Sequence, residues 1–371
     1  MGAIVQRLRR RAGRDARHGA KNRQTSHRGA YTAHRRGHRR GIPADKAKRV
    51  NQSLTRKLIA GLLFGFLVIL ALALLSDIRA VSQQMVNFRW ALYPLALALT
   101  LFNYVLRGFK FHYYLRQIGA QNIPLKASLR IFVAGFPLAV TPGKAGEAIK
   151  GIWIHHDAPK ISVARGVSVV LAERISDGLA VLLLSTAGVV AYPQYWPIFA
   201  FVLAALVGII IVSQIRPLAL ALLDLFARLP LIGRFSPSLR EFYEGSFALF
   251  RPGATLIATG LGAISWLGEG IGFYFILLGL GVTSSWQHLA LAVFILSFST
   301  VVGAVSALPG GLGAAEASIS AMLILLLGMD AGAAAAATLL VRFATLWFGV
   351  LLGLAAWYFS RDLLGLQPAD G

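Results

Sequence analysis

Long apolar runs, separated by short polar segments, dominate the chain from about residue 58 onward. A helix needs about 17–25 predominantly apolar residues to cross the hydrocarbon core of a membrane. Several runs reach this length with few or no charged residues. The predicted membrane-spanning helices are residues 58–76, 90–106, 163–191, 198–214, 254–280 and 331–360. The pattern therefore predicts an all-α polytopic membrane protein with about six transmembrane helices.

One apolar run is too short for this pattern. Ile131–Val140 covers ten residues, which cannot cross the hydrocarbon core. Basic residues concentrate in cytoplasmic loops, which predicts a cytoplasmic N-terminus and cytoplasmic basic loops at residues 107–130 and 216–251. The basic residues of the first loop are Arg107, Lys110, Arg116, Lys126 and Arg130. A crossing at 131–140 would move 216–251 to the opposite side, so we predict a re-entrant hairpin at 127–141 and a cytoplasmic C-terminus.

A Pro-Gly motif occurs twice, as TPGKAGEA from residue 141 and as LPGGLGAAEA from residue 308. Arg174 lies 27 residues after Glu147, and Arg342 lies 26 residues after Glu316. Three predicted spans separate the motifs, and an odd number reverses orientation. We therefore predict an inverted repeat, residues 58–191 and 198–360, with a re-entrant hairpin in each half; chance recurrence of Pro-Gly turns is the alternative. The predicted hairpin tips contain Pro142, Gly143, Gly146, Pro309, Gly310, Gly311 and Gly313.

Ionisable residues occur inside the predicted spans and hairpins, where each costs about 2.5–3.5 kcal/mol at the bilayer centre. They are Lys144, Glu147, Glu173, Arg174, Asp177, Glu269, Glu316 and Arg342. Cations on a Pro-Gly loop or within a span suit an anionic lipid headgroup, so we interpret Lys144, Arg174 and Arg342 as headgroup-binding residues. The five acids are then charge partners that orient these cations or relay protons. Salt bridges that only fix helix packing are the alternative, above all for Glu173 and Asp177, which share a helix face.

Charge adds a second feature, a basic tail at the N-terminus. The formal net charge of the chain is +22, and residues 1–57 hold 18 of its 37 Lys and Arg against only Asp15 and Asp45. With almost no large apolar residues, this tail is expected to be a disordered cytoplasmic segment that binds the anionic leaflet surface. A solvated extension without a partner is the alternative, and nucleic acid is not expected because aromatic residues are missing apart from Tyr31. Three domains are predicted: the tail, a transmembrane domain at 58–360 and a short C-terminal tail at 361–371.

Several classes of chemistry are not expected. The chain has no Cys, which excludes disulfides and Cys-based metal or redox sites. Residues His155, His156 and Asp157 resemble a metal cluster, but neighbouring residues on a helix do not face together, so we expect an interfacial loop and no metal or cofactor. Neither a nucleotide-binding P-loop nor a Gly-x-Ser-x-Gly motif occurs. No catalytic residue is therefore predicted, and the apolar run from Leu58 begins too late for a cleaved signal peptide.

Three ordered motifs carry a resemblance to a known family. They are Pro142-Gly-Lys-Ala-Gly-Glu147, Ala172-Glu-Arg-Ile-Ser-Asp177 and Pro309-Gly-Gly-Leu-Gly-Ala-Ala-Glu316-Ala. Together they resemble the lysylphosphatidylglycerol synthase transmembrane region, also called the flippase-like membrane family, over roughly residues 58–360. The resemblance implies a membrane domain that moves lipids between leaflets. In two-part members this domain flips aminoacylated phosphatidylglycerol made by a C-terminal soluble transferase, and related members are linked to polyprenyl-phosphate sugar carriers.

The chain departs from the two-part members at its C-terminal end and at one motif position. Eleven residues follow Ser360, so no soluble aminoacyl-transferase domain is expected, and a separate lipid-synthesising enzyme is a possible partner. Lys144 stands where the motif often has Arg, which keeps the charge but loses bidentate geometry. We predict a lipid translocase in the cell membrane that moves an anionic lipid and is not an enzyme. The alternatives are a membrane-embedded lipid-modifying transferase with Glu147 or Glu316 as base, and a non-transporting scaffold.

Overall fold

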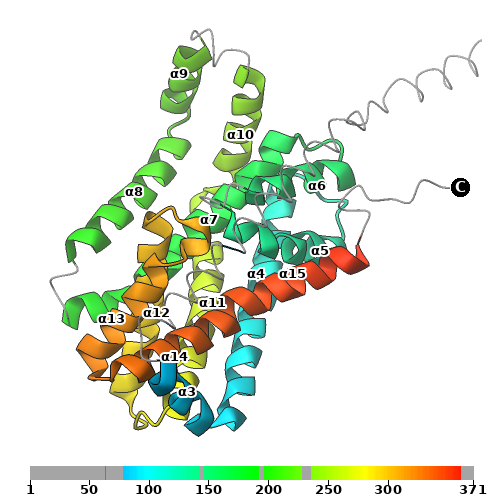
Figure 1. Cartoon of the computed structure of the whole chain (residues 1–371). Helices are drawn as coiled ribbons and strands as arrows, with labels where there is room; N and C mark the ends of the chain where they lie inside the picture. Colours follow the sequence, from blue (N-terminus) through cyan, green and yellow to red (C-terminus); the bar gives the residue numbers. More distant parts are fainter. Residues whose placement is uncertain (1–62, 64–77, 142–145, 192–195, 228–234, 361–371) are drawn as a thin grey trace, which may run out of the picture. The chain divides into compact units, whose positions relative to one another are not determined.

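A computed structural model describes residue 63 and residues 78–141, 146–191, 196–227 and 235–360 (Figure 1). All of them belong to the second of two units into which the chain divides, Leu54–Gly371. The described residues form helices and connecting turns and contain no strand, so the predicted all-α fold class is confirmed. The tail, the first predicted span (apart from Leu63) and residues 361–371 lie outside the described residues.

The helices follow one another closely along the chain. The first group is α3 (Ile78–Asn87), η1 (Trp90–Leu92), α4 (Tyr93–Gln117), α5 (Leu125–Ala134), η2 (Phe136–Val140), α6 (Ile149–Asp157), α7 (Val163–Ala191), α8 (Trp196–Gln214), α9 (Arg216–Ala227) and α10 (Ser236–Leu249). The second group is α11 (Pro252–Gly279), α12 (Trp286–Val305), η6 (Pro309–Gly311), α13 (Ala314–Leu327), α14 (Ala331–Arg342), the π-helical turn η7 (Phe343–Trp347) and α15 (Phe348–Phe359).

Five helical segments of the described residues are long and apolar enough to cross a membrane. They are Trp90–Gln117, Pro252–Gly279, Trp286–Val305, Pro309–Leu327 and Ala331–Phe359. A sixth results if Ala200–Gln214 and Arg216–Leu225, which meet at 90°, form one broken span. The predicted number of about six spanning helices is thus confirmed. In addition, α7 occupies the 29 residues predicted as a span, although several charged groups interrupt its apolar sequence.

Two predicted loops are in fact helical. The prediction that Arg107 and Lys110 lie in a loop is wrong, because α4 continues to Gln117 and buries both side chains. A charged residue need not end a membrane helix when a neighbouring helix neutralises its charge. The segment 216–251 is likewise helical, since α9 and α10 cover most of it and are joined by an Arg216–Glu244 ion pair of 2.9 Å.

The two Pro-Gly segments differ in the helices that flank them. Helices α5 and α6 contain 10 and 9 residues, each about 15 Å long and too short to cross a membrane. By contrast, α12 contains 20 residues and α13 contains 14. The turns η2 and η6 nevertheless contact each other, so the two segments meet inside the protein. The inverted repeat and the re-entrant hairpins stay predictions.

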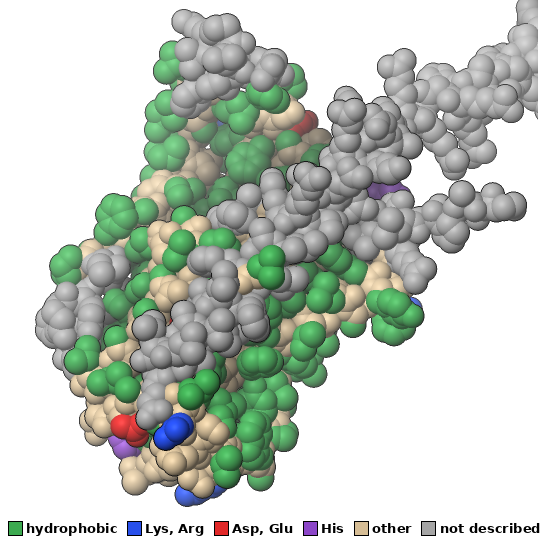
Figure 2. All heavy atoms as spheres, in the orientation of Figure 1, with side chains coloured by type: hydrophobic (Ala, Val, Ile, Leu, Met, Phe, Trp, Pro, Cys, Tyr) green, Lys and Arg blue, Asp and Glu red, His purple; other side chains and the backbone are tan. Residues whose placement is uncertain are grey.

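Small residues allow the central helices to pack closely. Along the contact between α4 and α11, a Cβ added at Gly272 would lie 3.3 Å from the Ala96 carbonyl oxygen. Such small-residue contacts let helix backbones approach each other in membrane proteins. The outer surface is apolar as well, with exposed side chains such as Phe201, Leu256 and Leu325. Figure 2 shows hydrophobic side chains spread over the described surface of one face with few charged ones between them, as expected for contact with lipid.

Candidate functional site

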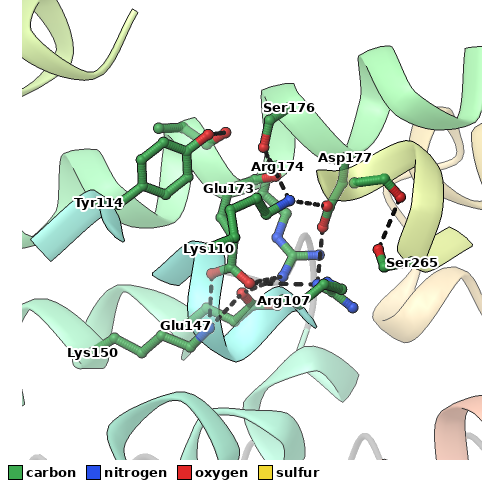
Figure 3. Close-up of polar contacts among 12 residues, drawn as sticks. Arg107, Lys110, Tyr114, Glu147, Lys150, Glu173, Arg174, Ser176, Asp177 and Ser265 are labelled. Atoms are coloured by element: carbon green, nitrogen blue, oxygen red, sulfur yellow. Dashed lines mark hydrogen bonds and ion pairs between the residues drawn. The ribbon is translucent and has the colours of Figure 1, made fainter. Parts of the chain in front are cut away.

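A buried charge cluster joins α4 to α7 (Figure 3). The Arg107 Nη2 atom lies 2.9 Å from Asp177 Oδ2 and 3.4 Å from Glu173 Oε1. Lys110 forms an ion pair with Asp177 and donates to Ser176 Oγ at 3.2 Å. Arg107 and Lys110 are three residues apart on α4, and the acids are four apart on α7, so each pair lies on one helix face. The two faces have opposite charge and neutralise each other across the helix contact.

The same cluster extends from α7 to the first Pro-Gly segment and α6. Lys150 Nζ lies 3.2 Å from Glu173 Oε2 and 3.6 Å from Glu147 Oε2. Arg174 Nη2 lies 3.1 Å from Glu147 Oε2 and 3.7 Å from Glu173 Oε1. Four cations therefore face three acids, a net charge of +1. The first charge cluster, as we call this set, consists of Arg107, Lys110, Glu147, Lys150, Glu173, Arg174 and Asp177.

The second Pro-Gly segment carries a simpler ion pair. Arg342 Nε donates to Glu316 Oε1 at 2.5 Å, and Arg342 Nη2 donates to the Gly310 carbonyl oxygen at 3.2 Å. The other carboxylate oxygen of Glu316 accepts from the Gly313 amide at 2.7 Å, which caps the start of α13. Arg342 is the last residue before the π-helical turn, a feature often found at functional sites. The Tyr104 hydroxyl donates to the Thr345 carbonyl of that turn.

Left-handed backbone shapes the second segment. Gly310 and Gly311 have φ angles of +62° and +68°, which only glycine adopts without strain. A Cβ at Gly311 would also lie 3.0 Å from the Cα atom of Gly303 in α12. The conformation turns the Gly310 carbonyl to Arg342. In the first segment, Thr141 Oγ1 accepts a hydrogen bond of 2.9 Å from the Gly146 amide, so a side chain joins the two ends of this loop.

One further acid, Glu269 of α11, belongs to neither group. Its residue is only 4% exposed, and it forms no ion pair or side-chain hydrogen bond with the part of the chain that the structure describes. Arg107 and Arg342 are near enough for their charges to act on its carboxylate. Glu269 thus adds a buried carboxyl group to the cavity that Arg107 and Arg342 also line.

A cavity of about 750 Å³ connects these groups. Its wall includes Arg107, Glu147, Lys150, Glu173, Arg174, Asp177, Glu269 and Arg342, together with apolar residues. The side chains of Arg174 and Arg342 keep 31% and 15% of their surface exposed, whereas their partners Glu147 and Glu316 keep 2% and 3%. The acids are therefore fixed in the protein, and the two guanidinium groups present the accessible charge.

The sequence model of the family described as Lysylphosphatidylglycerol synthase TM region matches residues 58–353. The chain belongs to this family. It is also similar to the UPF0104 membrane protein PH1989 of Pyrococcus horikoshii, with 27% identity over 252 residues that cover 60% of this chain and 73% of the relative. The predicted resemblance is confirmed, and this family member is accordingly a multi-pass membrane protein in contact with membrane lipids.

The structure brings most of the predicted site residues of this family member together. Glu147 with Arg174 and Glu316 with Arg342, separated by 27 and 26 residues in the sequence, both form ion pairs. Their cations line one cavity with Glu173, Asp177 and Glu269. Lys144 and the tip residues Pro142 and Gly143 lie outside the described residues. The roles assigned to all these side chains in binding a headgroup stay predictions.

Sequence reasoning missed three cations, Arg107, Lys110 and Lys150. The sequence pattern places the first two in a loop and does not distinguish the third from other residues. The spacing of Arg107 and Lys110, complementary to that of Glu173 and Asp177, is the signal that could have identified them. The expected loop at residues 155–157 is the last turn of α6, where His155 Nδ1 lies 2.7 Å from the Ile161 carbonyl oxygen.

Proposed function

We propose that this protein moves a lipid with an anionic headgroup between the two leaflets of the cell membrane, without altering the lipid chemically. The observation that carries the proposal is the placement of Arg174 and Arg342. These cations come from the sequence-distant helices α7 and α14 and pair with the glutamates of the two Pro-Gly segments. Both line one cavity among helices that can span a membrane. Such a cavity lowers the cost of taking a phosphate group out of water.

Ion-pair exchange supplies a mechanism for this role. When no lipid is bound, Glu147 and Glu316 neutralise the two arginines, which avoids unpaired cations within the protein. A lipid phosphate offers the same geometry as a carboxylate to a guanidinium group and can accept two parallel hydrogen bonds. The partly exposed Arg174 and Arg342 engage the phosphate, while the buried acids retain their positions. Binding is then reversible, as transport requires.

The family supports the lipid as substrate class. The matched family is named for a region of a lipid synthase, and the resemblance implies phospholipids, aminoacyl-phospholipids or polyprenyl-phosphate-linked lipids as the class of cargo. A separate enzyme would synthesise such a lipid. In this proposal both termini are cytoplasmic, and residues 1–57 bind the anionic leaflet.

Purified protein in phosphatidylcholine and phosphatidylglycerol vesicles tests the proposal. Trace phosphatidylglycerol with a fluorescent acyl chain reports leaflet exchange, because a membrane-impermeant reductant quenches only the outer leaflet. We expect exchange to depend on the protein and to fall at least about tenfold, equal to about 1.4 kcal/mol, in Arg174→Gln and Arg342→Gln. Arg240→Gln is the matched control, since Arg240 is half exposed and pairs with Asp224 at the surface.

Two outcomes would reject transport by this protein. Exchange equal to that of empty vesicles would show that the protein does not transport the lipid. Full exchange in both arginine variants would show that Arg174 and Arg342 do not form the binding site. Mass spectrometry of the same vesicles separates transport from the transferase alternative, which requires a new lipid species. We expect the lipid masses to be unchanged.

A further inference from the structure

The cavity wall is divided into a charged part and an apolar part. The charged residues come from α4, α6, α7, α11, α14 and, in the case of Glu147, the first Pro-Gly segment. Where α8 and α12 form the wall, it consists largely of aliphatic side chains. The aliphatic residues are Val202, Leu206 and Ile209 of α8 and Leu296, Val301, Ala304 and Val305 of α12, beside Ser299, Thr300 and Gly303 of α12. A cavity with separate charged and apolar walls matches an amphiphile, whose headgroup and hydrocarbon chain need different surroundings.

A second cavity, of about 510 Å³, continues the apolar wall toward the outside of the helix bundle. Its lining residues are Pro197, Phe201 and Val202 of α8, and Val302, Val305 and Ser306 of α12. Val202 and Val305 line both cavities, so the two adjoin at these residues. The Ser306 hydroxyl donates to the Gly303 carbonyl oxygen at 2.8 Å. The hydroxyl of Ser306, the one polar residue in this lining, therefore already donates a hydrogen bond within the protein. The groove offers mainly apolar contact to a ligand.

The packing of α8 leaves its α12 side comparatively free. Among the described helices, α8 packs mainly on α7, α9 and α10. On the α7 side, for example, a Cβ added at Gly178 would lie 2.9 Å from the Leu206 side chain. Figure 1 shows α8 at the edge of the bundle. Between Trp196 and Gln214 the helix has no charged residue, and Phe201 is 70% exposed. An apolar helix of this kind can face lipid on one side and a hydrocarbon chain on the other.

We propose that the groove between α8 and α12 is a lateral portal, occupied by the hydrocarbon chain of a lipid whose headgroup lies in the charged cavity. The proposal rests on the proposed function for the identity of this lipid. The two cavities adjoin at Val202 and Val305, and this supports a hydrocarbon chain as the occupant, because a headgroup beside Arg174 and Arg342 leaves its chain against the apolar wall. The chain then stays in apolar surroundings while the headgroup crosses.

Photolabelling tests the occupant with the unmodified protein. The probe is phosphatidylglycerol with a diazirine at the end of one acyl chain, activated in vesicles and followed by peptide mass spectrometry. We expect labels at α8 and α12 that excess unlabelled phosphatidylglycerol removes, whereas labels on Leu256 and Leu325, which face outward on other helices, persist. Labels spread evenly over the apolar surface without such competition would overturn the proposal.

Cross-linking tests whether the portal must open. The chain contains no Cys, so Val202→Cys with Val305→Cys introduces a unique pair of thiols for a cleavable bifunctional reagent. The matched control is Ser162→Cys with Glu241→Cys, at a contact between the start of α7 and α10 where Ser162 Oγ lies 3.3 Å from Glu241 Oε2. We expect the α8–α12 cross-link to reduce lipid exchange at least tenfold and cleavage to restore it, with no effect of the control cross-link.

The outcomes separate the portal from the proposed function. If the unmodified protein exchanges lipid and the cross-linked α8–α12 pair does so at the same rate, the portal is rejected and the transport function stands. If the unmodified protein exchanges no lipid but the competed labels still fall on α8 and α12, transport is rejected and the chain-binding groove stands.

Discussion

The two Pro-Gly segments hold the same Glu–Arg pair in different surroundings. Glu147 and Arg174 belong to the first charge cluster, where four cations and three acids from α4, the first Pro-Gly segment, α6 and α7 contact one another. Glu316 and Arg342 have no other charged side chain in ion-pair contact among the described residues, and backbone groups of Gly310 and Gly313 complete their hydrogen bonds.

This difference shows that Arg174 and Arg342 are positioned by different kinds of contact. Arg174 is positioned by Glu147 and Glu173, which also contact Lys150, so its place depends on the charge balance of the whole cluster. Arg342 is positioned by backbone geometry, namely by the left-handed glycines of η6 and the capped start of α13. We therefore expect the first segment to be sensitive to changes of charge and the second to changes of backbone conformation.

The largest effect is expected from Glu173→Gln. Glu173 is fully buried and contacts Arg107, Lys150 and Arg174, so its neutralisation leaves four cations against two acids. Removing one partner from a buried ion-pair network costs about 3–5 kcal/mol, measured as the free energy of unfolding in mixed micelles. Adding Lys150→Met restores the net charge of +1 and should recover part of the loss. An unchanged stability of the single variant would contradict a cluster held by charge.

A smaller effect is expected from Glu316→Ala, which removes both the partner of Arg342 and the cap of α13. The unpaired guanidinium and the lost cap together cost about 2–3 kcal/mol. Glu316→Gln is the matched control, because its side-chain oxygen can still accept from the Gly313 amide. The same unfolding measurement should show Gln less destabilised than Ala by about 1 kcal/mol. Equal losses would show that the backbone contact contributes nothing.

Gly311→Ala tests the backbone geometry directly. The left-handed φ angle of +68° costs about 1–2 kcal/mol for a residue with a Cβ, and the added atom meets Gly303. Gly260→Ala is the control, since a Cβ at Gly260 in α11 would meet nothing within 4 Å. We expect the thermal unfolding midpoint to fall in the first variant and to stay constant or rise in the second. A midpoint unchanged by Gly311→Ala would contradict the expectation that the second segment depends on its backbone conformation.

The smallest change in stability is expected from Glu269→Gln, outside both segments. Because Glu269 has no ion pair within the described residues, its neutralisation should change the free energy of unfolding by less than about 1 kcal/mol or stabilise the protein. Glutamine cannot carry a negative charge at this position, so phosphatidylglycerol should bind at least as tightly in a fluorescence titration. Weaker binding of this lipid would contradict a headgroup site centred on the two arginines.

The helices and their order were largely predictable from sequence. Helices α7, α8, α11 and the helix formed by α14, η7 and α15 lie within two residues of the predicted spans 163–191, 198–214, 254–280 and 331–360. Apolar length predicts these helices because every backbone group in lipid must bond within its own segment, although α7 also contains four charged residues. The spacing from each Pro-Gly glutamate to its arginine was likewise a property of the chain, and each pair forms an ion pair.

The tertiary structure decided what hydropathy along one segment cannot represent. Arg107 and Lys110 read as the end of a span, yet they are buried because Glu173 and Asp177 of α7 lie opposite them. The cavity shared by Arg174 and Arg342, and its continuation between α8 and α12, arise only from packing of helices distant in sequence. Sequence determined which residues enter the membrane region; the contacts between helices decided which of their charges are neutralised and which line the cavity.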